Sequence, residues 1–188
     1  MEPQKTAKPL ITKAVEHSLT LKFEDIPDAT RASAKTLILD SLGVGLAGSS
    51  TTESGWLQEF ATKNSSGQTS NGWNMNQKLD AANAAMINAH QMHTLEFDAI
   101  HEPAVVHPMT VVFPSVVAWM QRAHVTQGYV PNGKDLIKAV CVGVDIAGGL
   151  GDVTTSPLQF FRPATAGAIG AVAAINSISS PTTEQAMS

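Results

Sequence analysis

Apolar residues recur along this chain at the three- and four-residue spacing of helices that bury one face. The spacing predicts a first amphipathic helix from Leu10 to Leu19. It predicts a second helix that has Pro27 in its first turn and runs to about Ala47. We expect the buried face of this second helix to carry Ala34, Leu37, Ile38 and Leu42. The first quarter of the chain is therefore predicted to be helical.

The pattern then stops and restarts several times. Thr51 and Thr52 can cap a short third helix, inside which we expect Trp56, Leu57 and Phe60. Residues 64–76 are rich in Ser, Asn and Gly and predict a loop with a short extended piece around Trp73. Asp80 is the predicted cap of a helix that runs to His93.

Helices resume after a break at residues 96–108. The pattern predicts helices over residues 111–123 and 134–150, separated by a Gly- and Pro-containing turn at 128–133. A last helix should start near Pro163 and present a smooth face to a neighbouring backbone, made of Gly167, Gly170, Ala171 and Ala174. No βαβ alternation and no fixed repeat occur, so the prediction is an all-α fold.

A glycine-rich run at residues 148–151 has the composition of a nucleotide-binding loop. No predicted strand precedes it, and no Gly-Lys-Ser/Thr follows it. We therefore interpret this run as a helix end and a loop.

Composition restricts the class of protein. With 188 residues and 43% hydrophobic content, the chain can bury a core as one domain or as a piece of a larger one, with residues 1–8 as a flexible N-terminus. Its net charge is −4 without a Lys/Arg cluster, which disfavours nucleic acid. The single cysteine, Cys141, excludes a disulfide within the chain and fits a reducing compartment. Without a secretory signal or an apolar segment of membrane-spanning length, we expect a cytoplasmic protein with no membrane partner.

Chemistry-bearing residues concentrate between His90 and His107, which hold four of the six histidines together with Glu96, Asp98 and Glu102. One interpretation is a solvated helix end and loop. A metal site is a second, since His90 and His93 could share a helix face, but the thiolates of structural zinc and the His-Glu-x-x-His order of zinc proteases are missing, so we predict no metal. The third is acid/base catalysis beside a carboxylate, which needs one group to take a proton and another to help the leaving group.

The segment Leu95–Pro108 resembles the signature of the MmgE/PrpD family, roughly His-x-x-Leu-Glu-Phe-Asp-Asp-x-His followed by His-Pro. Residues 31–43, 133–140 and 163–171 resemble three further blocks of the family in the same order. The resemblance implies an all-α domain like the family's N-terminal part. The family also has a smaller α/β domain. The resemblance therefore implies that residues 1–188 form a truncated, partial domain without that α/β domain.

Members of this family include 2-methylcitrate dehydratase, cis-aconitate decarboxylase and iminodisuccinate epimerase, which move a proton beside a carboxylate without a metal or organic cofactor. The resemblance therefore implies cofactor-free lyase or isomerase chemistry, as a dehydratase or decarboxylase, on a small polycarboxylate substrate. It also implies a homodimer, or a complementary chain that carries the missing domain. Because the family's site lies between its two domains, we expect the isolated chain to have weak or no activity.

The same resemblance assigns residues to roles. It places Asp98 and His107 as the first catalytic candidates and Glu96 and His101 as the second. If Phe97 and Ile100 form an apolar pocket around Asp98, that pocket would desolvate the Asp98 carboxyl group. The predicted substrate-binding residues are Arg162 and His93.

Three positions depart from the family pattern. Ala99 and Ile100 replace an acidic residue and a Thr or Val, and Arg162 stands where the family has a histidine. Arginine does not release a proton near neutral pH, although it can bind a carboxylate through two nitrogens. The alternative interpretation is therefore a catalytically degenerate relative or fragment that acts as a structural or interaction module. A generic helical module with a coincidental His/acid loop is a third.

Overall fold

The computed structural model describes residues 8–155 and 161–187 of the chain. Within these residues, the first half contains α1 (Leu10–Thr20), a 3-10 turn (Phe23–Asp25), α2 (Asp28–Gly48), α3 (Thr52–Asn64), β1 (Ser70–Asn71) and β2 (Lys78–Leu79). The second half contains α4 (Ala81–His93), α5 (Pro108–Gln127), α6 (Gly133–Asp152), α7 (Arg162–Ser179) and α8 (Thr183–Met187). The only strands in the described part form one short antiparallel pair, so the all-α prediction is confirmed. The flexible end predicted for residues 1–8 lies outside the described residues except for Lys8.

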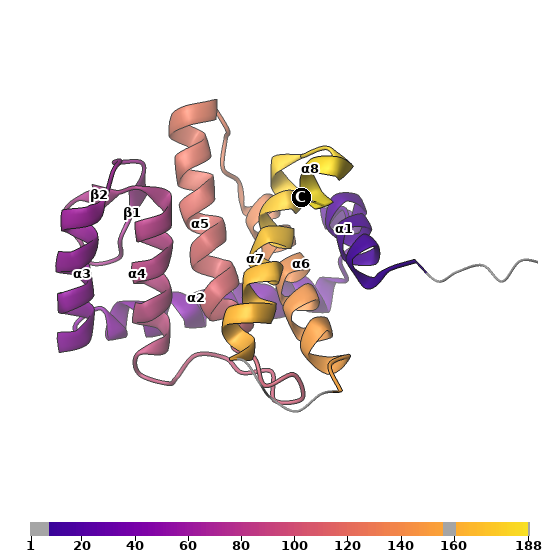
Figure 1. Ribbon diagram of the computed structural model, residues 1–188, viewed down its shortest axis with the longest axis horizontal. Helices are drawn as coiled ribbons and strands as arrows, with labels where there is room; N and C mark the ends of the chain where they lie inside the picture. The colour runs from indigo at the N-terminus through magenta and orange to yellow at the C-terminus, as the bar shows by residue number, and fades with distance from the viewer. Residues whose placement is uncertain (1–7, 156–160, 188) are drawn as a thin grey trace, which may run out of the picture.

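The helices form a row that is crossed by one long helix. Figure 1 shows α3, α4, α5, α7 and α6 standing side by side, with α2 running across them and α1 beside α6 and α7. Helix α2 contacts α4, α5 and α6, and it contributes the half-buried Leu37, Ile38 and Leu42 to a cluster around Met92 and Phe113. The face predicted for α2 is thus the one that packs, although Pro27 is the N-cap residue and not part of the first turn.

Helix α4 begins where the sequence predicted, because Asp80 caps it. Its Oδ1 accepts a hydrogen bond from the Asn83 backbone N–H at 3.0 Å, and its Oδ2 accepts from Ser65 and Ser66 of the preceding loop. Burial by itself would raise the pKa of Asp80, but the hydrogen bonds from Asn83, Ser65 and Ser66 together outweigh it and hold the pKa well below its ordinary value. Asp80 therefore fixes the start of α4 and the loop before it.

Helix α5 begins at Pro108, three residues before the predicted start. Proline is well suited to the first turn of a helix, since its missing N–H has no intrahelical partner there. Helix α6 runs to Asp152, so the glycine run at 148–151 belongs to its last turns. The helix end predicted there is confirmed, and the loop begins only after Asp152.

The glycine face predicted for α7 lies against α6 and α5. A Cβ atom on Gly170 would lie 2.5 Å from the backbone oxygen of Gly143, and one on Gly167 would lie 3.0 Å from Val111 Cγ2. A Cβ on Gly170 would clash with backbone, and one on Gly167 would require Val111 to shift. The two glycines therefore let α7 approach its neighbours closely.

The burial predicted for α3 is wrong at two positions. Trp56 is 67% exposed and Phe60 is 52% exposed, whereas Ser54 and Ala61 are fully buried. Helix α3 packs mainly on α4, so it can bury one narrow stripe, and the two aromatic side chains lie outside that stripe. No helix in the described part of the chain is long and apolar enough to cross a membrane.

Candidate functional site

The predicted catalytic segment forms a packed loop between α4 and α5. Figure 1 shows this loop at one edge of the row, close to the end of α6 and the start of α7. Within it, His101 and Val106 form an isolated antiparallel bridge with N···O distances of 2.8 and 3.3 Å. Ala104 and Val106 are fully buried in a cluster with Ala147 of α6 and others. The loop is therefore attached to the helices by its own apolar residues.

Contacts around Ala104 hold the loop to both neighbouring helices. A Cβ atom on Gly151 of α6 would lie 2.4 Å from the Cβ of Ala104, so the backbone of α6 lies directly against the loop. Arg162 Nη1, at the start of α7, donates a hydrogen bond to the Ala104 carbonyl at 3.1 Å. The positions of α6 and α7 therefore determine where the loop places its side chains.

Two residues of this segment have the left-handed backbone conformation that favours glycine. Glu96 has φ 54° and Val105 has φ 53°. This conformation is uncommon outside glycine and is an outlier for a β-branched residue such as valine. Such strain persists only where surrounding contacts impose it, and it occurs often at functional sites.

A buried carboxylate lies at the centre of the segment. The side chain of Asp98 has no exposed surface. His93 Nδ1 lies 3.1 and 3.2 Å from its two oxygens, and His107 Nδ1 lies 3.0 Å from Oδ2. Thr110, in the first turn of α5, donates its hydroxyl to the same Oδ2. Asp98 therefore joins the end of α4 to the start of α5.

The two histidines contact Asp98 in different ways. His93 Nδ1 has hydrogen-bond geometry, whereas His107 Nδ1 is close enough for an ion pair but is not aligned for a hydrogen bond. Catalytic hydrogen bonds are often poorly aligned before substrate binds, so the 3.0 Å separation still pairs His107 with Asp98. The His93 and His107 rings meet edge to face with centroids 4.9 Å apart. One proton on either ring would neutralise the buried carboxylate.

Phe97 and Ile100 do not form an apolar pocket around Asp98. Phe97 is 75% exposed and Ile100 is 52% exposed, so the sequence neighbours of Asp98 point outward. The carboxylate is surrounded by polar groups of His93, His107 and Thr110 instead. A buried carboxylate needs partners of this kind, because burial without them is costly.

With this geometry established, comparison with known proteins identifies the family. Residues 14–188 match the MmgE/PrpD N-terminal domain. The chain belongs to the MmgE/PrpD family. Cis-aconitate decarboxylase from Mus musculus is 30% identical over 159 residues, which cover 82% of this chain and 32% of the mouse protein. The Homo sapiens cis-aconitate decarboxylase is 28% identical over 159 residues with the same coverage, so the chain spans about a third of the length of these relatives.

In this MmgE/PrpD chain, the structure brings together three of the six residues that the sequence assigned to the site. Asp98, His107 and His93 are in direct contact. Glu96 lies at the edge of this group, with its side chain 72% exposed and its Oε1 3.5 Å from His93 Nε2. The trio of His93, Asp98 and His107 is therefore the centre of the candidate site.

The other two predicted residues contact the loop and not the trio. His101 Nδ1 accepts a hydrogen bond from the Ala104 N–H at 3.3 Å and lies 3.9 Å from Asp152 Oδ1. Arg162 binds the Ala104 carbonyl, as described above. Their catalytic and substrate-binding roles stay predictions.

Sequence reasoning did not identify Thr110. It lies three residues after His107, as a buried hydroxyl residue in the otherwise apolar first turn of α5. A polar residue at a buried position of a helix that directly follows a site histidine is the pattern that could have indicated it.

The same trio has the composition of a metal-ligating set. One ligand atom from each of His93, Asp98 and His107 lies within 4.8 Å of the others. Spacing along the sequence suggested only a different pair, His90 and His93, because it does not show that the loop after α4 folds back onto His93.

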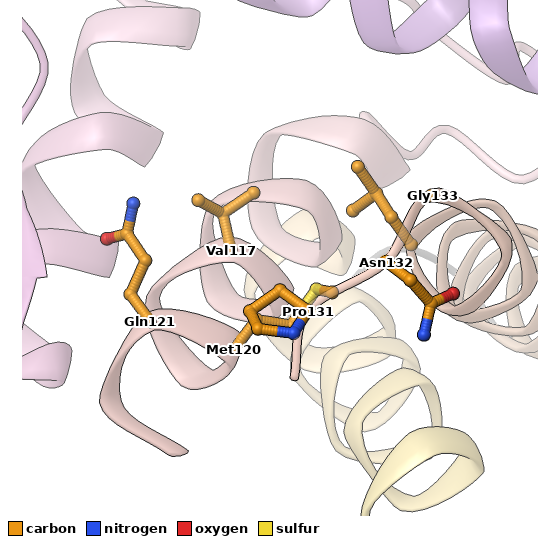
Figure 2. A pocket seen from close by; sticks show the side chains of 7 residues that line it. Val117, Met120, Gln121, Pro131, Asn132 and Gly133 are labelled. Atoms are coloured by element: carbon orange, nitrogen blue, oxygen red, sulfur yellow. The ribbon is translucent and has the colours of Figure 1, made fainter. Parts of the chain in front are cut away.

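A hollow of about 330 Å³ lies farther along α5, between its second half and the start of α6. Figure 2 shows Val117, Met120 and Pro131 in its wall, with the amides of Gln121 and Asn132 near the edge. None of its lining residues titrates. It is open to the surface and lacks groups for acid/base chemistry, which are in the loop before α5.

Proposed function

We propose that this chain provides acid/base groups for a lyase-type reaction on a small polycarboxylate, as a decarboxylase or dehydratase of the cis-aconitate or 2-methylcitrate type. The observation that carries the proposal is the fully buried Asp98 carboxylate in contact with His93 and His107. Asp98 and His107 lie in the segment that resembles the family signature, and His93 lies two residues before it. Relationship to two cis-aconitate decarboxylases supports the same class of substrate.

His107 is suited to move the proton in either reaction. When a carbon loses CO2, it keeps the electron pair of the broken bond and must receive a proton. In a dehydration, a proton beside a carboxylate is removed and hydroxide leaves. Asp98 faces His107 Nδ1, so a proton on Nδ1 is stabilised and Nε2 is left to exchange protons with a substrate. The His107 side chain is 18% exposed, which keeps it accessible.

Substrate carboxylates need positive or donor groups nearby. Arg162 uses Nη1 on the Ala104 carbonyl, and its guanidinium carries further N–H donors that suit a carboxylate. His93, with its side chain 31% exposed, is a second donor at the edge of the trio. We propose that a second copy or a complementary chain covers this face, because enclosure excludes water and strengthens such contacts.

The test is CO2 release from cis-aconitate and water loss from 2-methylcitrate. Each assay is run with the 188-residue chain alone and together with the part of the mouse decarboxylase outside the matched region. We expect turnover in the combined sample, and His107→Ala should lower kcat by at least about 100-fold, as expected for loss of a general acid or base. His124→Ala is the matched control. His124 is exposed, and its Nδ1 forms a hydrogen bond with the Tyr129 carbonyl, away from the trio.

Equal turnover for His107→Ala and His124→Ala would refute the role of His107. If no combination turns over either acid, the alternative interpretation of a structural or interaction module is favoured. The departures at Ala99, Ile100 and Arg162 are the observations behind that alternative.

A further inference from the structure

We propose that His93, Asp98 and His107 also form a binding site for one divalent transition-metal ion of the Zn²⁺ class, and that this ion inhibits the acid/base chemistry of the site. The inhibition rests on the proposed function, whereas the binding does not. The site differs from the His90/His93 pair that spacing alone would suggest, because it joins the end of α4 to the residue before α5.

The separations between the ligand atoms suit such an ion. Zinc lies about 2.0–2.2 Å from nitrogen and oxygen ligands, so neighbouring ligands around a tetrahedral ion are about 3.3 Å apart. His93 Nδ1 and His107 Nδ1 lie 3.1 and 3.0 Å from oxygens of Asp98. The three ligand atoms lie within 4.8 Å of one another, so a small rotation of either ring completes the geometry.

The surroundings of the trio support a bound ion. Thr110 donates a hydrogen bond to Asp98 Oδ2 and so holds the carboxylate in place. Glu96 Oε1 lies 3.5 Å from His93 Nε2, the ring nitrogen that faces away from Asp98. This distance is too long for a normal hydrogen bond, but a shift of about 0.5 Å would let Glu96 accept one, as carboxylates that orient metal-bound histidines do. Thr110 and Glu96 thus contact the ligand residues without being ligands themselves, as the groups around metal ligands commonly do.

The charge of Asp98 and the exposure of the two histidines also suit a bound metal ion. A divalent ion would neutralise the fully buried Asp98 carboxylate without a protonated histidine. The side chains of His93 and His107 keep 31% and 18% of their surface exposed, which leaves a way in and an open position for water or a substrate carboxylate. Two imidazoles and one carboxylate suit Zn²⁺, Co²⁺, Ni²⁺ or Cu²⁺, whereas Mg²⁺ and Ca²⁺ require mostly oxygen ligands.

Metal binding would remove the basic nitrogen of His107. A neutral imidazole that binds a metal through Nδ1 carries its one proton on Nε2, so no lone pair is left to accept a proton. Asp98 would be occupied by the same ion. Substrate turnover and metal binding at the trio are therefore mutually exclusive.

The test is titration of the 188-residue chain with Co²⁺, followed by visible absorption, and with Zn²⁺, followed by calorimetry. We expect one tight site and a cobalt spectrum of four- or five-coordinate geometry. His93→Gln, His107→Gln and Asp98→Asn should each weaken this site by at least about 100-fold. Thr110→Val, which removes only the outer hydrogen bond, should weaken it by about 10-fold, the usual effect of an outer group. Circular dichroism checks that each variant is folded.

His124→Gln is the matched control and should bind like the wild type, because it removes an exposed histidine outside the trio. The metal site is refuted if the wild type binds no ion tightly, or if the trio variants bind as well as His124→Gln. Turnover is measured separately, with chelator and with added Zn²⁺. Turnover without tight metal binding would refute only the metal site. Metal binding without turnover would refute only the catalytic role. Turnover that persists when the trio is loaded with Zn²⁺ would refute inhibition.

Discussion

Replacing Gly151 with alanine tests whether the end of α6 holds the catalytic loop in place. A Cβ at this position would lie 2.4 Å from the Cβ of Ala104 and 2.9 Å from its Cα and its oxygen. Ordinary carbon contacts are about 3.5 Å or longer, so the loop would have to move away from α6 by about 1 Å. The loop leads directly into His107, so the displacement should reach the trio.

The magnitude follows from two opposing effects. Overpacking of this kind costs about 1–3 kcal/mol, and the higher helix propensity of alanine returns up to about 1 kcal/mol. We expect a net loss of about 1–2 kcal/mol for Gly151→Ala. For a chain of this size, that lowers Tm by about 2–8 °C. A displacement of about 1 Å at a catalytic group can also cost about 100-fold in turnover.

Gly149 provides a matched control two residues away in the same turn of α6. A Cβ on Gly149 would meet nothing within 4 Å. Gly149→Ala should therefore gain only helix propensity, up to about 1 kcal/mol, and raise Tm by about 2–4 °C. The assay is urea and thermal unfolding of both variants, followed by Co²⁺ titration. Equal stability of the two variants, or an unchanged cobalt site in Gly151→Ala, would refute the close packing of the loop on α6.

Two further predictions concern the frame around the site. Gly170→Ala should lower the free energy of unfolding in urea by about 1–3 kcal/mol, because its Cβ would lie 2.5 Å from the Gly143 oxygen. Gly43→Ala is the control and should not destabilise the fold, because the space around Gly43 is open. The reverse order of stability would contradict the packing of α7 on α6. Asp80→Ala should lower the free energy of unfolding at about pH 7 by about 1–2 kcal/mol through loss of the helix cap. Because the folded pKa of Asp80 is lowered, its charge stabilises the fold fully above the unfolded value of about 3.9. This contribution decreases as the pH falls from that value and is lost as the pH passes through the folded pKa. The difference between Asp80→Ala and wild type should therefore shrink below about pH 4, and a difference that grows on acidification would contradict the assignment.

Local patterns predicted the helices α1 to α7, although α5 begins three residues before its predicted start. Apolar spacing located α1, α2 and α4, and the chemistry of a cap residue placed Asp80 correctly. The small residues of α7 indicated close helix packing before the contact of Gly170 with Gly143 was known. These features depend on residues a few positions apart, so the sequence contains them directly.

Burial on α3 could not be predicted in the same way. Trp56 and Phe60 are apolar at helical spacing, yet they are exposed because α3 packs mainly on one neighbouring helix. A periodic pattern shows that a face can be buried but not which helix covers it. That depends on the path of the whole chain.

The sequence by itself determined an all-α chain of the MmgE/PrpD family and the segment that holds its histidines and acids. Only the tertiary structure decided that His93 and His107, fourteen positions apart, share the buried carboxylate of Asp98, and that Thr110 supports it. Only the structure showed that Arg162 and Gly151 hold the loop through Ala104. The physical reason is that helix formation depends on nearest neighbours, whereas the loop takes its shape from the helices that pack around it.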